Sequence, residues 1–194
     1  MKFTRARAAG SPMMALLLLA ACAVALADEA RMQAGWVPRE FRFTYQGFTA
    51  KYSCDGLSDR IRAVLLLLGA RKQDLKVNPT GCSDGFGRAT PFPGVAVKMS
   101  VLEPLGEKSA PGTEPVATAW RNVDVVRRET LAAAGDCELT EQIKQSILPL
   151  FTTRNVDYSS TCVPHQLTPG GTTLKADVLV PVPQAPPPAS APAG

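Results

Sequence analysis

Residues 54–62 read CDGLSDRIR, and residues 137–144 read CELTEQIK. When one gap is allowed, both stretches have the same order of residue types. That order is a Cys, an acidic residue (followed by Gly in the first stretch), a Leu, a hydroxyl residue, an acid, a long polar residue, an Ile and a base. A second cysteine follows each stretch, at Cys82 and at Cys162, after an apolar and then a polar segment. Cysteine spacing, apolar pattern and element order agree, and this agreement favours an internal duplication over a chance likeness.

The duplication predicts two halves, at about residues 41–104 and 116–181, each with the order β-α-β-β. Apolar residues recur on one helical face over residues 57–68 and again over residues 139–150. Helices among strands with one polar face indicate an α+β fold, and we expect one antiparallel sheet with both helices on one face. The alternating segments that predict strands are 41–53 (one bulged strand, or two short ones that meet at Gly47), 74–82, 95–102, 116–127, 154–163 and 172–180.

The predicted helices carry local signals at their ends. Asp55 or Ser58 is placed to cap the first helix. Gly69 is placed to end that helix, and Pro149 to end the second. Residues 28–40 show no comparable pattern, and we expect an irregular lead-in there.

Four cysteines remain once Cys22 is assigned to a processed segment, and they are Cys54, Cys82, Cys137 and Cys162. An even number of cysteines in an exported chain favours two disulfides. Spacing alone does not choose among the three connectivities, but like halves predict Cys54–Cys82 and Cys137–Cys162. The cysteines form no closely spaced pair, so the sequence predicts neither a zinc site nor a redox dithiol.

Residues 1–27 have the three parts of a secretory signal peptide in order. Lys2, Arg5 and Arg7 give a positive start, an apolar run covers residues 13–27, and small residues precede Asp28. The apolar run is short for a membrane span, which needs about 20 residues. We therefore expect export to the periplasm or the cell exterior.

A second signal overlaps the first. Residues 19–22, LAAC, are similar to the lipobox of bacterial lipoproteins, in which the cysteine is lipidated and becomes the first residue. Lipidation of Cys22 would anchor the protein to a membrane, the one case in which we expect membrane contact. The apolar run continues beyond Cys22 to a competing cleavage site, so cleavage after Ala27 is the favoured prediction.

The remaining chain divides into one domain and a tail. Residues 28–180 are expected to form a single α+β domain. Residues 181–194 contain prolines among small and polar residues and no charge, a composition that buries no core. We expect a disordered tail there.

Charge and histidine content exclude several classes of function. The chain of 194 residues has 21 basic and 17 acidic residues, and loss of the signal peptide leaves 18 basic and 17 acidic. Such a near-neutral domain lacks the basic surface that nucleic-acid binding requires. His165 is the only histidine, which excludes a His-rich metal site. The sequence predicts no metal or other cofactor.

Residues 81–85, GCSDG, match the G-x-S-x-G motif of serine hydrolases, with Ser83 in the nucleophile position. That motif requires a helix directly after it. The following residues, FGRATPFPG, cannot begin a helix, and Cys82 is expected in a disulfide. The motif is therefore better explained as a connection between strands.

Three functions of different classes remain open. We favour an exported non-catalytic module with a structural or macromolecule-binding role, for which an envelope protein is the expected class of partner. The second is a secreted inhibitor or defence factor that acts on a foreign enzyme through a rigid loop, at residues 83–94 or 163–171. The third, least favoured, is a small hydrolase that uses Ser83. The first leads because the sequence assembles no catalytic set.

Overall fold

The computed structural model describes residues 32–48, 51–83, 86–88, 90–106, 112–127, 131, 136–163 and 171–182. The predicted signal peptide, Cys22, His165 and residues 183–194 of the predicted tail lie outside these described residues. In chain order the elements are β1 (Met32–Thr44), α2 (Cys54–Leu67), β2 (Lys76–Thr80), β3 (Gly94–Pro104), β4 (Val116–Asp124), α3 (Cys137–Ser146), the 3-10 turn η1 (Leu148–Leu150), β5 (Thr153–Ser160) and β6 (Thr172–Pro181).

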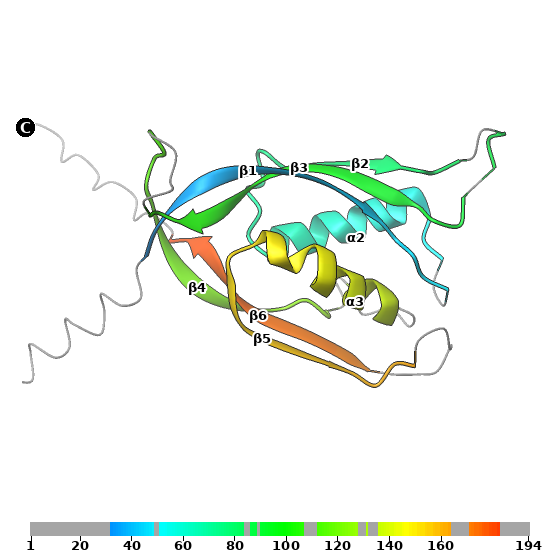
Figure 1. The fold of residues 1–194 in the computed structure, drawn as a ribbon. Helices are drawn as coiled ribbons and strands as arrows, with labels where there is room; N and C mark the ends of the chain where they lie inside the picture. Colours follow the sequence, from blue (N-terminus) through cyan, green and yellow to red (C-terminus); the bar gives the residue numbers. More distant parts are fainter. Residues whose placement is uncertain are drawn as a thin grey trace, which may run out of the picture.

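The described strands form one antiparallel sheet in the order β2-β3-β1-β4-β6-β5. The central strands β1 and β4 pair only over residues 32–34 of β1, so the two sides of the sheet diverge from a short seam. Figure 1 shows α2 and α3 between these two sides, with β1, β2 and β3 over one side of the helices and β4, β5 and β6 along the other. Together with two disulfides, this confirms the prediction of an α+β fold with an antiparallel sheet.

The core lies between the helices and the concave face of the sheet. Apolar side chains of both helices are fully buried against alternate residues of β3 and β6. Burying such side chains contributes about 1.5–3 kcal/mol each, and this is the main force that holds the helices in the fold. The central buried residues are Leu57, Ile61, Val64, Leu65, Leu139, Ile143, Ile147, Val95, Val97, Val101, Leu174, Ala176 and Val178.

The first helix begins earlier than the apolar pattern predicts. The cap is Ser53, whose Oγ accepts a hydrogen bond from the Gly56 amide at 3.1 Å, and so the prediction of Asp55 or Ser58 is wrong. Ser58 instead lies on the buried face. Gly69 follows the helix and has a φ of +99°, a conformation that favours glycine. The prediction that Gly69 ends the first helix is therefore confirmed. Pro149 lies in η1, directly after α3.

Two predictions at the start of the domain are wrong. Residues 32–40 are part of the long strand β1 rather than an irregular lead-in, and no strand continues beyond Thr44 into residues 45–48 or 51–53. Pro38 lies within this strand although proline cannot donate a hydrogen bond to a ladder. Pro38 lies opposite Ser100 of β3. The carbonyl of Ser100 points away from β1, because it accepts a hydrogen bond from the Arg71 amide. The nitrogen of Pro38 therefore faces the other side of β1, where the pairing with β4 has already ended.

Candidate functional site

Of the G-x-S-x-G motif at residues 81–85, the structure describes Gly81, Cys82 and Ser83. Ser83 is exposed, and the preceding Cys82 is bonded to Cys54. His165, the only histidine, lies outside the described residues. Among the residues that the structure describes, no three His, Cys, Asp or Glu side chains are grouped to hold a metal ion. No helix among them is long and apolar enough to span a membrane.

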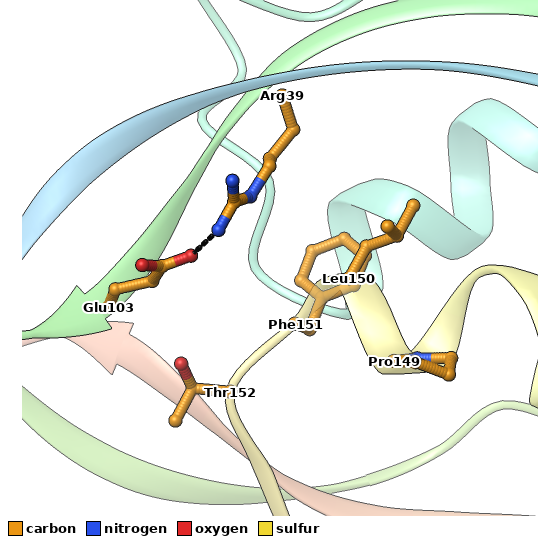
Figure 2. A pocket seen from close by; sticks show the side chains of 6 residues that line it. All are labelled: Arg39, Glu103, Pro149, Leu150, Phe151 and Thr152. Atoms are coloured by element: carbon orange, nitrogen blue, oxygen red, sulfur yellow. Dashed lines mark hydrogen bonds and ion pairs between the residues drawn. The ribbon is translucent and has the colours of Figure 1, made fainter.

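A pocket of about 310 Å³ lies beside the end of β3 (Figure 2). Its wall carries an ion pair between Arg39 of β1 and Glu103 of β3. Three apolar residues of the α3–β5 connection, Pro149, Leu150 and Phe151, line it together with Thr152. The pocket combines an apolar surface with a partly exposed ion pair, so it can accept an apolar group that has a polar or charged group beside it.

Exposed apolar side chains gather at the end of the molecule where both helices begin. Phe86 is 85% exposed and Phe48 is 69% exposed, while Phe92 and Val163 are nearly half exposed. We call these four residues the loop surface. They belong to the β1–α2, β2–β3 and β5–β6 connections. Large aromatic side chains with this exposure are typical of surfaces that bind another molecule.

Backbone hydrogen bonds place these connections side by side. The Tyr45 amide donates to the Pro93 carbonyl at 3.0 Å, which joins the start of the β1–α2 connection to the end of the β2–β3 connection. The Phe48 amide donates to Oε2 of Glu138 at 2.7 Å, and so Phe48 lies at the start of α3. The neighbouring Cys137 is bonded to Cys162, next to Val163. The loop surface therefore continues from the first disulfide-bonded loop to the second.

Each disulfide ties the first residue of a helix to a connection between strands. Cys54 begins α2 and bonds to Cys82, whereas Cys137 begins α3 and bonds to Cys162. The Thr90 amide also donates to the Cys82 carbonyl at 3.3 Å, closing the base of the β2–β3 connection. These crosslinks to helices in the core restrict the conformations that the two loops can adopt.

A pair of side-chain hydrogen bonds attaches the β1–α2 connection to α3. Oε1 of Gln142 accepts from the Gln46 amide, and its Nε2 donates to the Gln46 carbonyl, both at 3.0 Å. The side chain therefore satisfies one backbone residue much as a neighbouring strand would. The rings of Tyr45 and Tyr52 meet edge to face beneath this connection, with centroids 4.8 Å apart.

A buried carboxylate joins the two helices. Asp136 is only 2% exposed, accepts from the Tyr52 hydroxyl, and pairs with Nη1 of Arg60 at 3.0 Å. The guanidinium of Arg60 also lies 5.5 Å from the centroid of the Tyr52 ring. Burial, followed by the hydrogen bond to Asp136, raises the pKa of Tyr52 well above its ordinary value of 10.0. These contacts hold the starts of α2 and α3, and with them the loop surface, in one arrangement.

Replacing Tyr52 with Phe should remove part of the alkaline sensitivity of the fold. In the unfolded chain Tyr52 ionises near pH 10, whereas in the folded protein it stays neutral. Its contribution to stability is therefore complete below pH 10 and declines as the pH rises further. We expect the free energy of unfolding of the wild type to fall more steeply above pH 10 than that of Tyr52→Phe in urea titrations. Equal slopes for the two proteins would contradict this.

Comparisons of the chain with models of protein families, with curated proteins and with solved structures find no match.

The sequence named two of the three connections of the loop surface, at residues 83–94 and 163–171, as candidate binding loops, but it identified neither the exposed side chains nor the pocket. Phe86 and Phe92 lie in a segment without helical or strand periodicity, so the pattern did not distinguish exposed rings from buried ones there. Phe48 lies within residues 41–53, where the alternating pattern predicted strand, and the structure has no strand beyond Thr44 in this segment. The signal that could have found Phe86 and Phe92 is their position between glycines and between prolines, close to Cys82. Such flanking residues are typical of a surface loop.

Proposed function

We propose that the chain is an exported non-catalytic module that binds another macromolecule, an envelope protein being the expected class, through the loop surface. The observation that carries this proposal is the distribution of exposed apolar side chains. In the described part of the chain, the large apolar residues with the most exposed side chains are Met32, Phe48, Phe86, Phe92, Val156 and Val163. Four of these six form the loop surface, beside both disulfides.

Export is part of the proposal. Two disulfides in a small domain suit an oxidising compartment, because cytosolic thiols are kept reduced. The three-part signal in residues 1–27 supports the same location. We propose cleavage after Ala27 and a free periplasmic or secreted protein, with lipidation at Cys22 as the alternative. The region between signal and tail, residues 28–180, would then be a single domain.

We further infer that the domain arose by duplication of a β-α-β-β unit. The strand order β2-β3-β1-β4-β6-β5 is unchanged when it is read from the other edge with β1 and β4, β2 and β5, and β3 and β6 exchanged. Segments 97–104 and 174–181 read VKMSVLEP and LKADVLVP, and their buried and exposed positions follow the same order. Agreement of sequence, burial and topology supports one origin for both halves.

Two aromatic–cation pairs support the same duplication. The guanidinium of Arg71 lies 5.4 Å from the centroid of Trp36, and that of Arg154 lies 4.4 Å from that of Trp120. Each tryptophan lies on the first strand of its half, and each arginine follows the helix of its half. Cation–π contacts of this kind contribute about 0.5–1 kcal/mol at exposed sites.

The edges of the sheet argue against binding by strand addition. The edge strand β2 contains Pro79, which lacks an amide hydrogen. The other edge strand, β5, has an irregularity between Arg154 and Asp157, where Asn155 adopts a φ of +51°. Such features block pairing with another chain. Binding through side chains, such as those of the loop surface, is therefore favoured over strand addition.

An inhibitor of a foreign enzyme is a second candidate, favoured by one observation. The described part of the β2–β3 connection, which carries Phe86, projects beyond the helices (Figure 1). A projecting loop braced by the Cys54–Cys82 bond suits insertion into an enzyme cleft. Inhibition assays against a panel of proteases and lysozymes test this candidate. Inhibition that Phe86→Ala abolishes would favour an inhibitor over a module that binds an envelope partner.

For the hydrolase alternative, loss of a measured hydrolytic activity in Ser83→Ala is the deciding result.

A matched pair of variants tests the role of the loop surface. Val163 on the loop surface and Val156 on β5 are 45% and 46% exposed, so Val163→Ser and Val156→Ser remove equal apolar area at different places. Biotin-labelled protein is crosslinked in envelope and extracellular extracts of the source cells. We expect a discrete adduct that Phe48→Ser and Val163→Ser reduce by at least about fivefold, as for a residue that contributes over 1 kcal/mol. Val156→Ser should leave it unchanged, and equal adducts from all variants would contradict the proposal.

A further inference from the structure

The pocket beside β3 and the β2–β3 connection lie at opposite ends of one strand. Gly94 begins β3 directly after that connection, and Glu103 lies near the end of β3 in the wall of the pocket. At about 3.3 Å per residue, these two positions are roughly 30 Å apart. Figure 1 shows the β2–β3 connection at the opposite end of β3 from the end that carries Glu103. Phe86, which belongs to this connection, therefore does not reach the pocket of its own chain.

The two sites are complementary in chemistry. In the connection, the guanidinium of Arg88 lies 5.4 Å from the centroid of the Phe86 ring, so the chain presents an aromatic side chain together with a cation. In the pocket, Leu150 and Phe151 face a space bordered by the carboxylate of Glu103 (Figure 2). A volume of about 310 Å³ is at the lower end of the range for ligand pockets and suits a single aromatic side chain.

We propose that Phe86 and Arg88 of one copy insert into the pocket of a second copy, so that the protein self-associates head to tail. Phe86 contacts Leu150 and Phe151, and Arg88 lies beside Glu103, whose carboxylate is 38% exposed and is already paired with Arg39. Because the two contacting surfaces are different, each added copy leaves a free connection at one end and a free pocket at the other. This inference rests on the proposed structural or binding role of the loop surface and names a second copy as its occupant.

The contact is small, and its strength is limited accordingly. One loop in one pocket buries less surface than the 1,200 Å² or so typical of stable complexes. We therefore expect association at micromolar or higher concentration, with rapid exchange. Screening of the attraction between Arg88 and Glu103 should weaken association as the salt concentration rises.

Sedimentation equilibrium of the disulfide-bonded protein tests the proposal between about 1 µM and about 1 mM, the range expected for a small interface. The wild type should show a mean mass that rises with concentration to at least about 1.5 times that of one chain. Phe86→Ser, Arg88→Glu and Glu103→Lys should each stay monomeric, whereas Val156→Ser, which changes neither surface, should behave as the wild type. Far-ultraviolet circular dichroism confirms that every variant is folded.

Mixing two inactive variants distinguishes head-to-tail contact from other dimers. Phe86→Ser keeps an intact pocket and Glu103→Lys keeps an intact connection, so their mixture should form dimers that grow no further. A monomeric wild type, assembly that persists in Phe86→Ser, or a mixture that stays monomeric would overturn the proposal. If the wild type is monomeric but still forms the Val163-dependent adduct in extracts, self-association fails while the proposed binding function stands.

Discussion

Replacing both cysteines of either disulfide with alanine is expected to lower the free energy of unfolding by about 3 kcal/mol. The bonds close loops with sequence separations of 28 and 25 residues, so they restrict the unfolded chain to nearly the same extent. The measurement is urea unfolding of Cys54→Ala/Cys82→Ala and of Cys137→Ala/Cys162→Ala, followed by circular dichroism. Because small domains have only about 5–15 kcal/mol of stability, either loss is a large fraction of the total.

The two variants also control for each other. If each bond braces an equivalent half, their effects should agree within about 1 kcal/mol, since the entropic contributions of the two loops are almost equal. A loss below about 1 kcal/mol for either pair would contradict a bracing role for that bond. The loss of the Cys54–Cys82 bond should also weaken binding through the loop surface, because it frees the connection that carries Phe86.

Asp136→Ala is expected to destabilise the fold by about 2–3 kcal/mol, because it removes the buried partner of an ion pair whose other side chain, Arg60, is 29% exposed. The substitution deprives the guanidinium of Arg60 and the hydroxyl of Tyr52 of a common acceptor at a site that is 2% exposed. Thermal and urea unfolding of the variant measure the effect.

Tyr52→Phe provides the matched comparison for Asp136→Ala. It removes one hydrogen bond but leaves the pair between Arg60 and Asp136, so its cost should be only about 1 kcal/mol. If Asp136→Ala costs no more than Tyr52→Phe, the carboxylate does not connect the helices as described. Both variants should also be tested for formation of the crosslinked adduct. Asp136 immediately precedes Cys137, whose disulfide partner Cys162 is the neighbour of Val163 on the loop surface.

Local and repetitive features of the fold were predictable from the sequence. Helical spacing identified the buried faces of α2 and α3, because residues such as Ile61 and Ile143 recur with the helical period. The likeness of the segments around Cys54 and Cys137 selected one connectivity among three, the one present in the structure. These predictions needed only short-range patterns and one internal comparison.

Features that depend on partners distant in sequence were not predictable. The long strand β1 was missed because Pro38 is acceptable only where β4 has diverged, which the sequence of β1 does not reveal. The pocket joins Arg39, Glu103 and residues 149–152, which come from three separate segments. The backbone of Phe48 is hydrogen-bonded through its amide to Glu138 of α3, which lies 90 residues further along the chain. In each case tertiary structure determines the outcome.

The central claim is that an exported chain carries two halves, each braced by its own disulfide, that together support the loop surface. Intact-mass spectrometry of protein recovered from an exporting host, before and after thiol alkylation, tests it most directly when combined with peptide mapping of the disulfides. We expect a chain that begins at Asp28, no alkylated cysteine, and the bonds Cys54–Cys82 and Cys137–Cys162. An uncleaved chain, free thiols, or bonds that cross between the halves would contradict the claim.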